Sequence, residues 1–178
     1  MPVQPRPRIR IEKPAPSIDC GRYPPKRCEG DLVEVSADIF RDGHDILGAV
    51  VRWRGSKRSR WREAPMRPID EHVEGVRWAG AFVVETLGRW EWTIEAWTDG
   101  FATWRDELQR KLASGQTDLA AELSEGRLLL RQAAERARKP DRRIVEQALA
   151  LIEGADVPEA ARHDAAKAVA GCLGPNHP

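Results

Sequence analysis

Residues 88–98 constrain the fold most, because their side chains alternate strictly between two chemical types. Apolar residues occupy one face of the extended chain: Trp90, Trp92, Ile94 and Ala96. Polar residues occupy the other: Glu91, Thr93 and Glu95. A period of two is the signature of a half-buried β-strand, and aromatic and β-branched side chains suit a pleated surface. This segment therefore predicts a strand that buries its tryptophan face.

Short segments of the same kind precede this strand, separated by turn residues. They lie at residues 8–12, 32–41, 47–53, 61–66 and 77–84, and a polar loop is expected at residues 70–75. Several short strands at regular spacing predict an antiparallel β-sandwich. Its predicted core consists of Val33, Val35, Ile39, Val51, Trp53, Trp78, Phe82, Trp90, Trp92 and Ile94.

The pattern becomes helical after Asp99 and Gly100. Apolar spacing predicts four helices. The first covers residues 101–114 and the last covers residues 156–172. The second runs from a cap at Thr117 or Asp118 to residue 138, and the third from a cap at Asp141 to residue 152. Pro140 is expected to end the second helix. The expected class is thus α+β, with a β domain at residues 1–98 and a segment of three to four helices at residues 99–178. Four short helices cannot all cover one small sandwich, so we expect this segment to form a homodimer.

Composition excludes several classes of function. The net charge of +1 lacks the basic excess that binding to nucleic acid requires. No apolar run reaches 18 residues, so no membrane span is expected. Residues 1–10 lack the apolar region of a secretory signal, which predicts a cytoplasmic protein.

Metal-ligating and catalytic patterns are not found in the sequence. Cys20, Cys28 and Cys172 form no zinc pattern, and we expect free or buried thiols. Four histidines share no metal-ligand spacing: His44, His72, His163 and His177. Glu91 and Glu95 lie on one strand face about 13 Å apart and are expected to be solvated carboxylates. The sequence therefore predicts no catalytic, cofactor-binding or metal-binding residues.

The seven tryptophans include three whose environment the pattern leaves open. Burial is the favoured interpretation for those on the predicted core faces. Trp61, Trp97 and Trp104 could instead contact a sugar or another domain, because an indole combines a broad apolar face with a polar N–H group.

Two longer stretches carry a resemblance to a known family. Residues 17–27 read SIDCGRYPPKR and residues 33–45 read VEVSADIFRDGHD; residues 88–105 end in DGFATWR. These runs resemble the N-terminal region of bacterial α-1,4-glucan:maltose-1-phosphate maltosyltransferases, of the α-amylase-like glycoside hydrolase superfamily. The resemblance covers roughly residues 7–138.

The resemblance implies an immunoglobulin-like sandwich with a helical insert, both at a homodimer interface, followed by a (β/α)₈ barrel. The full-length enzyme would transfer maltosyl units from α-maltose 1-phosphate to α-1,4-glucans through two barrel carboxyl groups, about 5–5.5 Å apart as in retaining enzymes. No residue here matches them, so we expect a non-catalytic scaffold, inactive alone. Two alternatives stay open: a stand-alone carbohydrate-binding module for α-glucan, and a split or decayed gene product.

Overall fold

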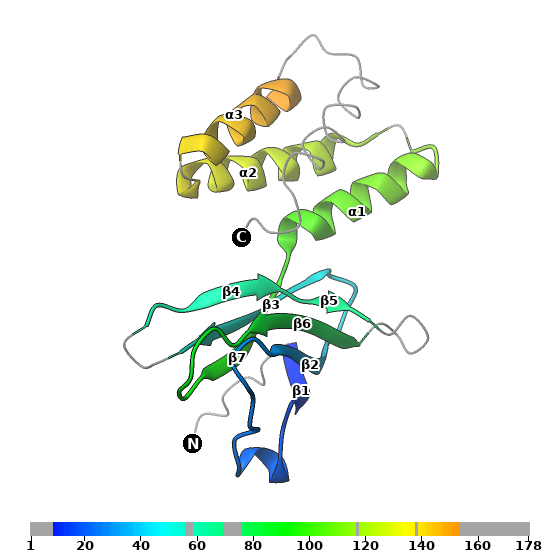
Figure 1. Cartoon of the computed structure of the whole chain (residues 1–178). Coiled ribbons are helices and arrows are strands. Elements are labelled where there is room, and N and C mark those ends of the chain that lie inside the picture. The colour runs from blue at the N-terminus through cyan, green and yellow to red at the C-terminus, as the bar shows by residue number, and fades with distance from the viewer. Residues whose placement is uncertain (1–8, 56–58, 70–75, 117, 138, 154–178) are drawn as a thin grey trace, which may run out of the picture. The chain divides into compact units, whose positions relative to one another are not determined.

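The computed structural model describes residues 9–55, 59–69, 76–116, 118–137 and 139–153. The chain separates into two compact units, Met1–Thr98 and Asp99–Pro178. The first unit holds two antiparallel sheets and the second holds helices (Figure 1). The predicted α+β composition, strands first and helices second, is therefore confirmed.

Among the described residues of the first unit, seven strands form two sheets. The four-stranded sheet has the order β1 (Ile9–Ala15), β2 (Leu32–Arg41), β6 (Arg77–Val83), β5 (Arg67–Pro68). The three-stranded sheet has the order β4 (Arg62–Pro65), β3 (Leu47–Arg54), β7 (Glu91–Thr98). Six of these strands match predicted segments. The two-residue strand β5 was not predicted, because it is too short to show a periodic pattern.

One apolar core joins the two sheets. It takes alternate residues of β2 and β6 from one sheet and of β3 from the other, including Val35, Val51 and Trp53. The rings of Trp53 and Phe82 stack with centroids 5.1 Å apart, and Phe82 lies 6.3 Å from Trp90. Burying each large apolar side chain stabilises the fold by about 1.5–3 kcal/mol. Every predicted core residue lies in this cluster or packs against it.

An ionic cluster links strand β1 to the neighbouring strands of its sheet. Arg77 donates from Nη1 to Asp38 Oδ1 (3.0 Å) and from Nη2 to Ser36 Oγ (2.7 Å), and Lys13 Nζ lies 3.1 Å from Asp38 Oδ2. The hydrogen bonds from Arg77 and then Lys13 hold the pKa of the Asp38 carboxyl below its usual value. The cluster therefore bridges β1, β2 and β6.

The second unit contains α1 (Gly100–Ala113), α2 (Ala120–Arg136) and α3 (Lys139–Glu153). The N-cap of the second helix is Leu119, not Thr117 or Asp118 as predicted, and Leu119 is 4% exposed because it packs in the helical core. Asp118 Oδ1 still accepts a hydrogen bond from the N–H group of Ala120 at 3.3 Å. Pro140 does not end α2. It lies in the first turn of α3, together with Asp141, where proline is tolerated because the N–H it lacks would have no helical acceptor.

Several sequence predictions fall outside the described residues. They are the polar loop at residues 70–75, the fourth helix at residues 156–172, and the environments of Cys172, His72, His163 and His177.

The core of the helical unit is built around Trp104. This indole is 2% exposed and donates from Nε1 to the Glu122 carbonyl oxygen at 2.6 Å. Its ring lies against Gly126 of α2: a Cβ placed on Gly126 would be 2.2 Å from Trp104 Cζ2. Buried leucine and valine side chains complete the cluster: Leu108, Leu119, Leu130 and Val145. The absent side chain at Gly126 is what allows α1 and α2 to approach.

A second ionic cluster ties α1 to α2. Lys111 Nζ contacts Glu122 and lies 2.9 Å from Glu107 Oε1. The hydrogen bond from Lys111 holds the pKa of Glu122 below its usual value. Hydrogen bonds to Glu122 and then Glu107 raise the pKa of Lys111. The cluster therefore favours the charged forms of Lys111 and Glu122 in the folded state.

Replacing Gly126 with alanine should destabilise the helical unit. The added methyl group would force Trp104 to shift, and overpacking of this kind destabilises a fold by about 1–3 kcal/mol. This cost exceeds the stabilisation that the higher helix propensity of alanine provides. Urea unfolding followed by circular dichroism at 222 nm measures the effect. Gly100→Ala is the matched control, since nothing lies within 4 Å of a Cβ at that position. A Gly126→Ala protein at least as stable as the wild type would contradict this packing.

Glu122 should make the stability of the helical unit fall with acid. Because its folded pKa is lowered, its contribution is present above the unfolded value of about 4.3 and is lost as pH falls through the folded value. Thermal melts at pH 6 and pH 3 should therefore differ less for Glu122→Gln than for the wild type. The exposed Glu125, on the same helix, supplies the control Glu125→Gln. Equal acid sensitivity of Glu122→Gln and wild type would rule out this contribution.

Candidate functional site

The outward side of the three-stranded sheet gathers the aromatic and charged residues that a binding surface needs. Along β3, Ala49, Val51 and Trp53 are buried, so the intervening residues point away from the core. Register places Arg52 opposite Thr93 of β7 and Glu63 of β4. We call this surface the outer face; it comprises Gly48, Val50, Arg52, Arg54, Trp61, Glu63, Glu91, Thr93, Glu95 and Trp97.

Arginines of β3 hold carboxylates of β7 on the outer face. Arg54 donates from Nε (2.9 Å) and Nη2 (2.7 Å) to Glu91 Oε2. Arg52 donates from Nη1 to Glu95 Oε1 at 2.6 Å. The sequence predicted solvated carboxylates at Glu91 and Glu95. The side chain of Glu95 is indeed 51% exposed, but both carboxylates are ion-paired, which the sequence pattern did not predict.

Trp61 lies at one end of the outer face, beside both arginines. The guanidinium carbon of Arg54 is 4.6 Å from the centre of its ring and that of Arg52 is 5.8 Å away. Trp61 is 37% exposed. The arginines therefore support one side of an indole that still reaches solvent, in the geometry of a cation–π contact.

Trp97 lies at the other end, directly opposite Gly48. A Cβ on Gly48 would be 2.7 Å from Trp97 Cε2 and 2.9 Å from its Nε1, so the indole occupies the space that any other residue would fill. Trp97 is partly exposed. Gly48 and Arg54 are six residues apart on β3, which spans about 20 Å. The two indoles thus mark the ends of an elongated surface.

The third predicted position, Trp104, lies in the other unit and is buried there against Gly126. The structure therefore brings Trp61 and Trp97 to one face and places Trp104 in a packing position. Sequence reasoning missed Gly48, Arg52 and Arg54 as members of the surface. Their alternation on β3 was visible, but only the pairing of β3 with β7 and β4 shows what they contact.

Proton-transfer chemistry receives little support from the described carboxyl groups. A general acid at neutral pH needs a raised pKa, whereas ion pairs lower the pKa of Asp38 and of Glu122. Within residues 9–55, 59–69, 76–116, 118–137 and 139–153, no three His, Cys, Asp or Glu side chains gather as metal ligands would. Cys20 and Cys28 are exposed free thiols. On the outer face, the carboxylates of Glu91 and Glu95 lie against the guanidinium groups of Arg54 and Arg52.

Membrane insertion is not indicated by the helices that the structure describes. None of them combines the length and the apolar character needed to cross a bilayer.

Comparison with known proteins identifies the family. Residues 7–174 match the family described as alpha-1,4-glucan:maltose-1-phosphate maltosyltransferase, domain N/S. This match extends through both compact units. It therefore covers the outer face and the three helices together.

Curated relatives carry the same enzyme name. The chain is 44% identical over 134 residues to the alpha-1,4-glucan:maltose-1-phosphate maltosyltransferase of Myxococcus xanthus, covering 73% of this chain and 19% of the relative. It is 35% identical over 174 residues to that of Salinibacter ruber, covering 96% and 25%. It is 38% identical over 162 residues to maltosyltransferase 1 of Streptomyces coelicolor, covering 89% and 23%.

These alignments compare a short chain with long relatives. The chain spans 19% to 25% of the length of these three proteins. The match to the domain family, by contrast, covers most of the chain. The chain belongs to the N/S-domain family of the alpha-1,4-glucan:maltose-1-phosphate maltosyltransferases.

Proposed function

We propose that this chain is the non-catalytic N-terminal module of a maltose-1-phosphate maltosyltransferase. In the full-length enzyme, maltosyl units would pass from α-maltose 1-phosphate to the non-reducing end of α-1,4-glucans at a separate barrel domain. The observation that carries this proposal is the family match through both units, residues 7–174. The two sheets with a shared core suit the immunoglobulin-like sandwich that the resemblance implies.

The role proposed for the module is structural support rather than chemistry. A retaining glycosyl transfer requires two carboxyl groups about 5–5.5 Å apart. Glu91 and Glu95 lie four residues apart on one strand face, a separation of about 13 Å, and each is paired with an arginine of β3. Their separation supports a scaffold function.

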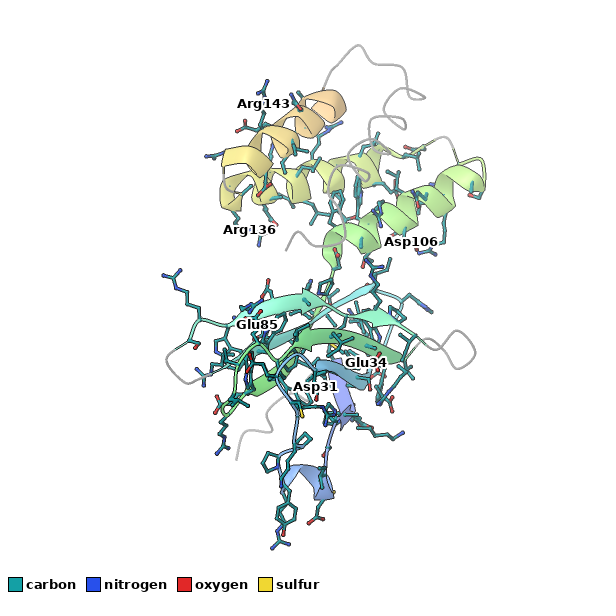
Figure 2. The ribbon with its side chains drawn as sticks, in the orientation of Figure 1. Asp31, Glu34, Glu85, Asp106, Arg136 and Arg143 are labelled. Atoms are coloured by element: carbon teal, nitrogen blue, oxygen red, sulfur yellow. The ribbon has the colours of Figure 1, made fainter. Side chains whose placement is uncertain are left out.

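The helical unit is proposed to form a homodimer. Two large apolar side chains on its helices are exposed: Leu128 of α2 is 57% exposed and Ile144 of α3 is 38% exposed. Leu128 lies among polar neighbours on the solvent side of α2, opposite the buried Leu130. Figure 2 labels the charged Arg136 near the end of α2 and Arg143 on α3. Single exposed apolar side chains are common on protein surfaces. The dimer therefore rests on the family resemblance, and Leu128 marks the exposed side of α2 on which it can be tested.

Dimer formation can be tested on the whole chain. We expect light scattering coupled to size-exclusion chromatography to show a dimer, and Leu128→Glu to shift it toward monomer because a charge would be buried at the interface. Gln109→Glu changes the charge at an exposed position of α1 and is expected to leave the dimer intact. Circular dichroism verifies that both variants fold.

Two results would contradict this assignment. A wild-type chain that stays strictly monomeric at high protein concentration would exclude the dimer role. A Leu128→Glu chain that dimerises as well as wild type would exclude the exposed side of α2 as the interface.

A further inference from the structure

We propose that the outer face of the three-stranded sheet is a binding platform for α-glucan chains. Trp61 and Trp97 would provide two stacking surfaces, and the arginine–glutamate pairs between them would bind hydroxyl groups. The choice of an α-1,4-linked glucan rests on the proposed function. The platform itself rests on the geometry of the outer face.

Both indoles are held in place by strand β3. Trp97 fills the space over Gly48, and Trp61 lies beside the guanidinium groups of Arg54 and Arg52. Each ring is partly exposed. An aromatic ring supported from behind loses little freedom on binding, so contact with the C–H groups of a sugar ring costs little conformational entropy.

The groups between the indoles match a polyhydroxylated ligand. A sugar hydroxyl both donates and accepts hydrogen bonds, and the outer face offers fixed partners of both kinds. Glu95 accepts from Arg52 through Oε1 and is 51% exposed, so its carboxylate can accept further bonds. Arg52 and Arg54 are oriented by ion pairs before any ligand arrives. This arrangement is preorganised for hydrogen bonding.

A protein partner fits this face less well. The cores of protein–protein interfaces are depleted in charged residues, and burying ion pairs carries a desolvation cost. Charged residues predominate on the outer face, beside Val50 and Thr93: Arg52, Arg54, Glu63, Glu91 and Glu95. Three acids against two bases also disfavour a polyanion. A neutral ligand that binds through hydroxyl groups and water leaves these pairs solvated.

The dimensions of the face favour a chain rather than a single sugar. The positions under the two indoles are separated by six residues of β3, about 20 Å. A monosaccharide is much shorter than this distance. Only an oligosaccharide can contact both rings at once, so affinity should rise with chain length.

Isothermal titration calorimetry of the whole chain with maltoheptaose tests the proposal. The wild-type chain should bind maltoheptaose at millimolar concentration. It should bind maltose more weakly than maltoheptaose, and cellohexaose most weakly of the three. Trp97→Ala and Trp61→Ala should each weaken binding by about 3- to 10-fold, the magnitude of a lost aromatic contact. Gly48→Ala should weaken it similarly, because the new methyl group displaces Trp97 without removing it.

Tyr23→Ala is the matched control. Tyr23 is an exposed aromatic residue, 53% accessible, that follows the short 3₁₀ turn Asp19–Gly21 and lies outside the outer face. Its replacement should leave the affinity for maltoheptaose unchanged. Circular dichroism melts of every variant separate loss of binding from loss of fold. A Tyr23→Ala loss as large as that of Trp97→Ala would overturn the proposal.

Failure of the platform can be distinguished from failure of the scaffold role. No heat with maltoheptaose, or equal affinity for cellohexaose, overturns the platform, while light scattering on the same samples reports the dimer separately. If Trp97→Ala dissociates a dimer and leaves sugar binding unchanged, the outer face is a contact between copies of this chain and the platform is wrong.

Discussion

The first unit depends on apolar contact between the inner faces of its two sheets. Trp53 and Phe82 come from different sheets and stack at 5.1 Å, and Trp90 continues the aromatic column. Aromatic contacts of this kind add about 0.5–1.5 kcal/mol to the burial itself. Because side chains alternate along each strand, burying one set forces the other set outward. Packing of the core therefore determines which residues of β3 and β7 lie on the outer face.

Glycine performs the same packing function in both units. Gly48 leaves room for Trp97 on the sheet, and Gly126 leaves room for Trp104 between two helices. The two tryptophans differ in how deeply their side chains are buried. Trp97 remains partly exposed, whereas Trp104 is enclosed and its N–H is bonded to a backbone carbonyl. One tryptophan is therefore available to a ligand and the other stabilises helix packing.

Ion pairs within each unit account for the shifted pKa values of this chain. The groups with shifted pKa values, Asp38, Lys111 and Glu122, are each held in the charged form by an opposite charge. The chain belongs to the maltosyltransferase N/S-domain family and spans a fifth to a quarter of the length of the relatives compared. The proposed scaffold and glucan platform both follow from residues arranged for contact.

The sequence by itself determined the elements and the buried faces. Period-two alternation in β2, β3 and β7 identified the strands and their core residues, because local geometry forces alternate side chains onto opposite faces. Tertiary structure alone decided which strands pair, and hence that Arg54 meets Glu91 and Trp97 meets Gly48, contacts between residues 37 and 49 positions apart. It also placed the buried Leu119 at the N-cap of α2, while Asp118 Oδ1 accepts a hydrogen bond from the Ala120 N–H group at 3.3 Å. Local pattern cannot specify contacts that form only when distant segments pack together.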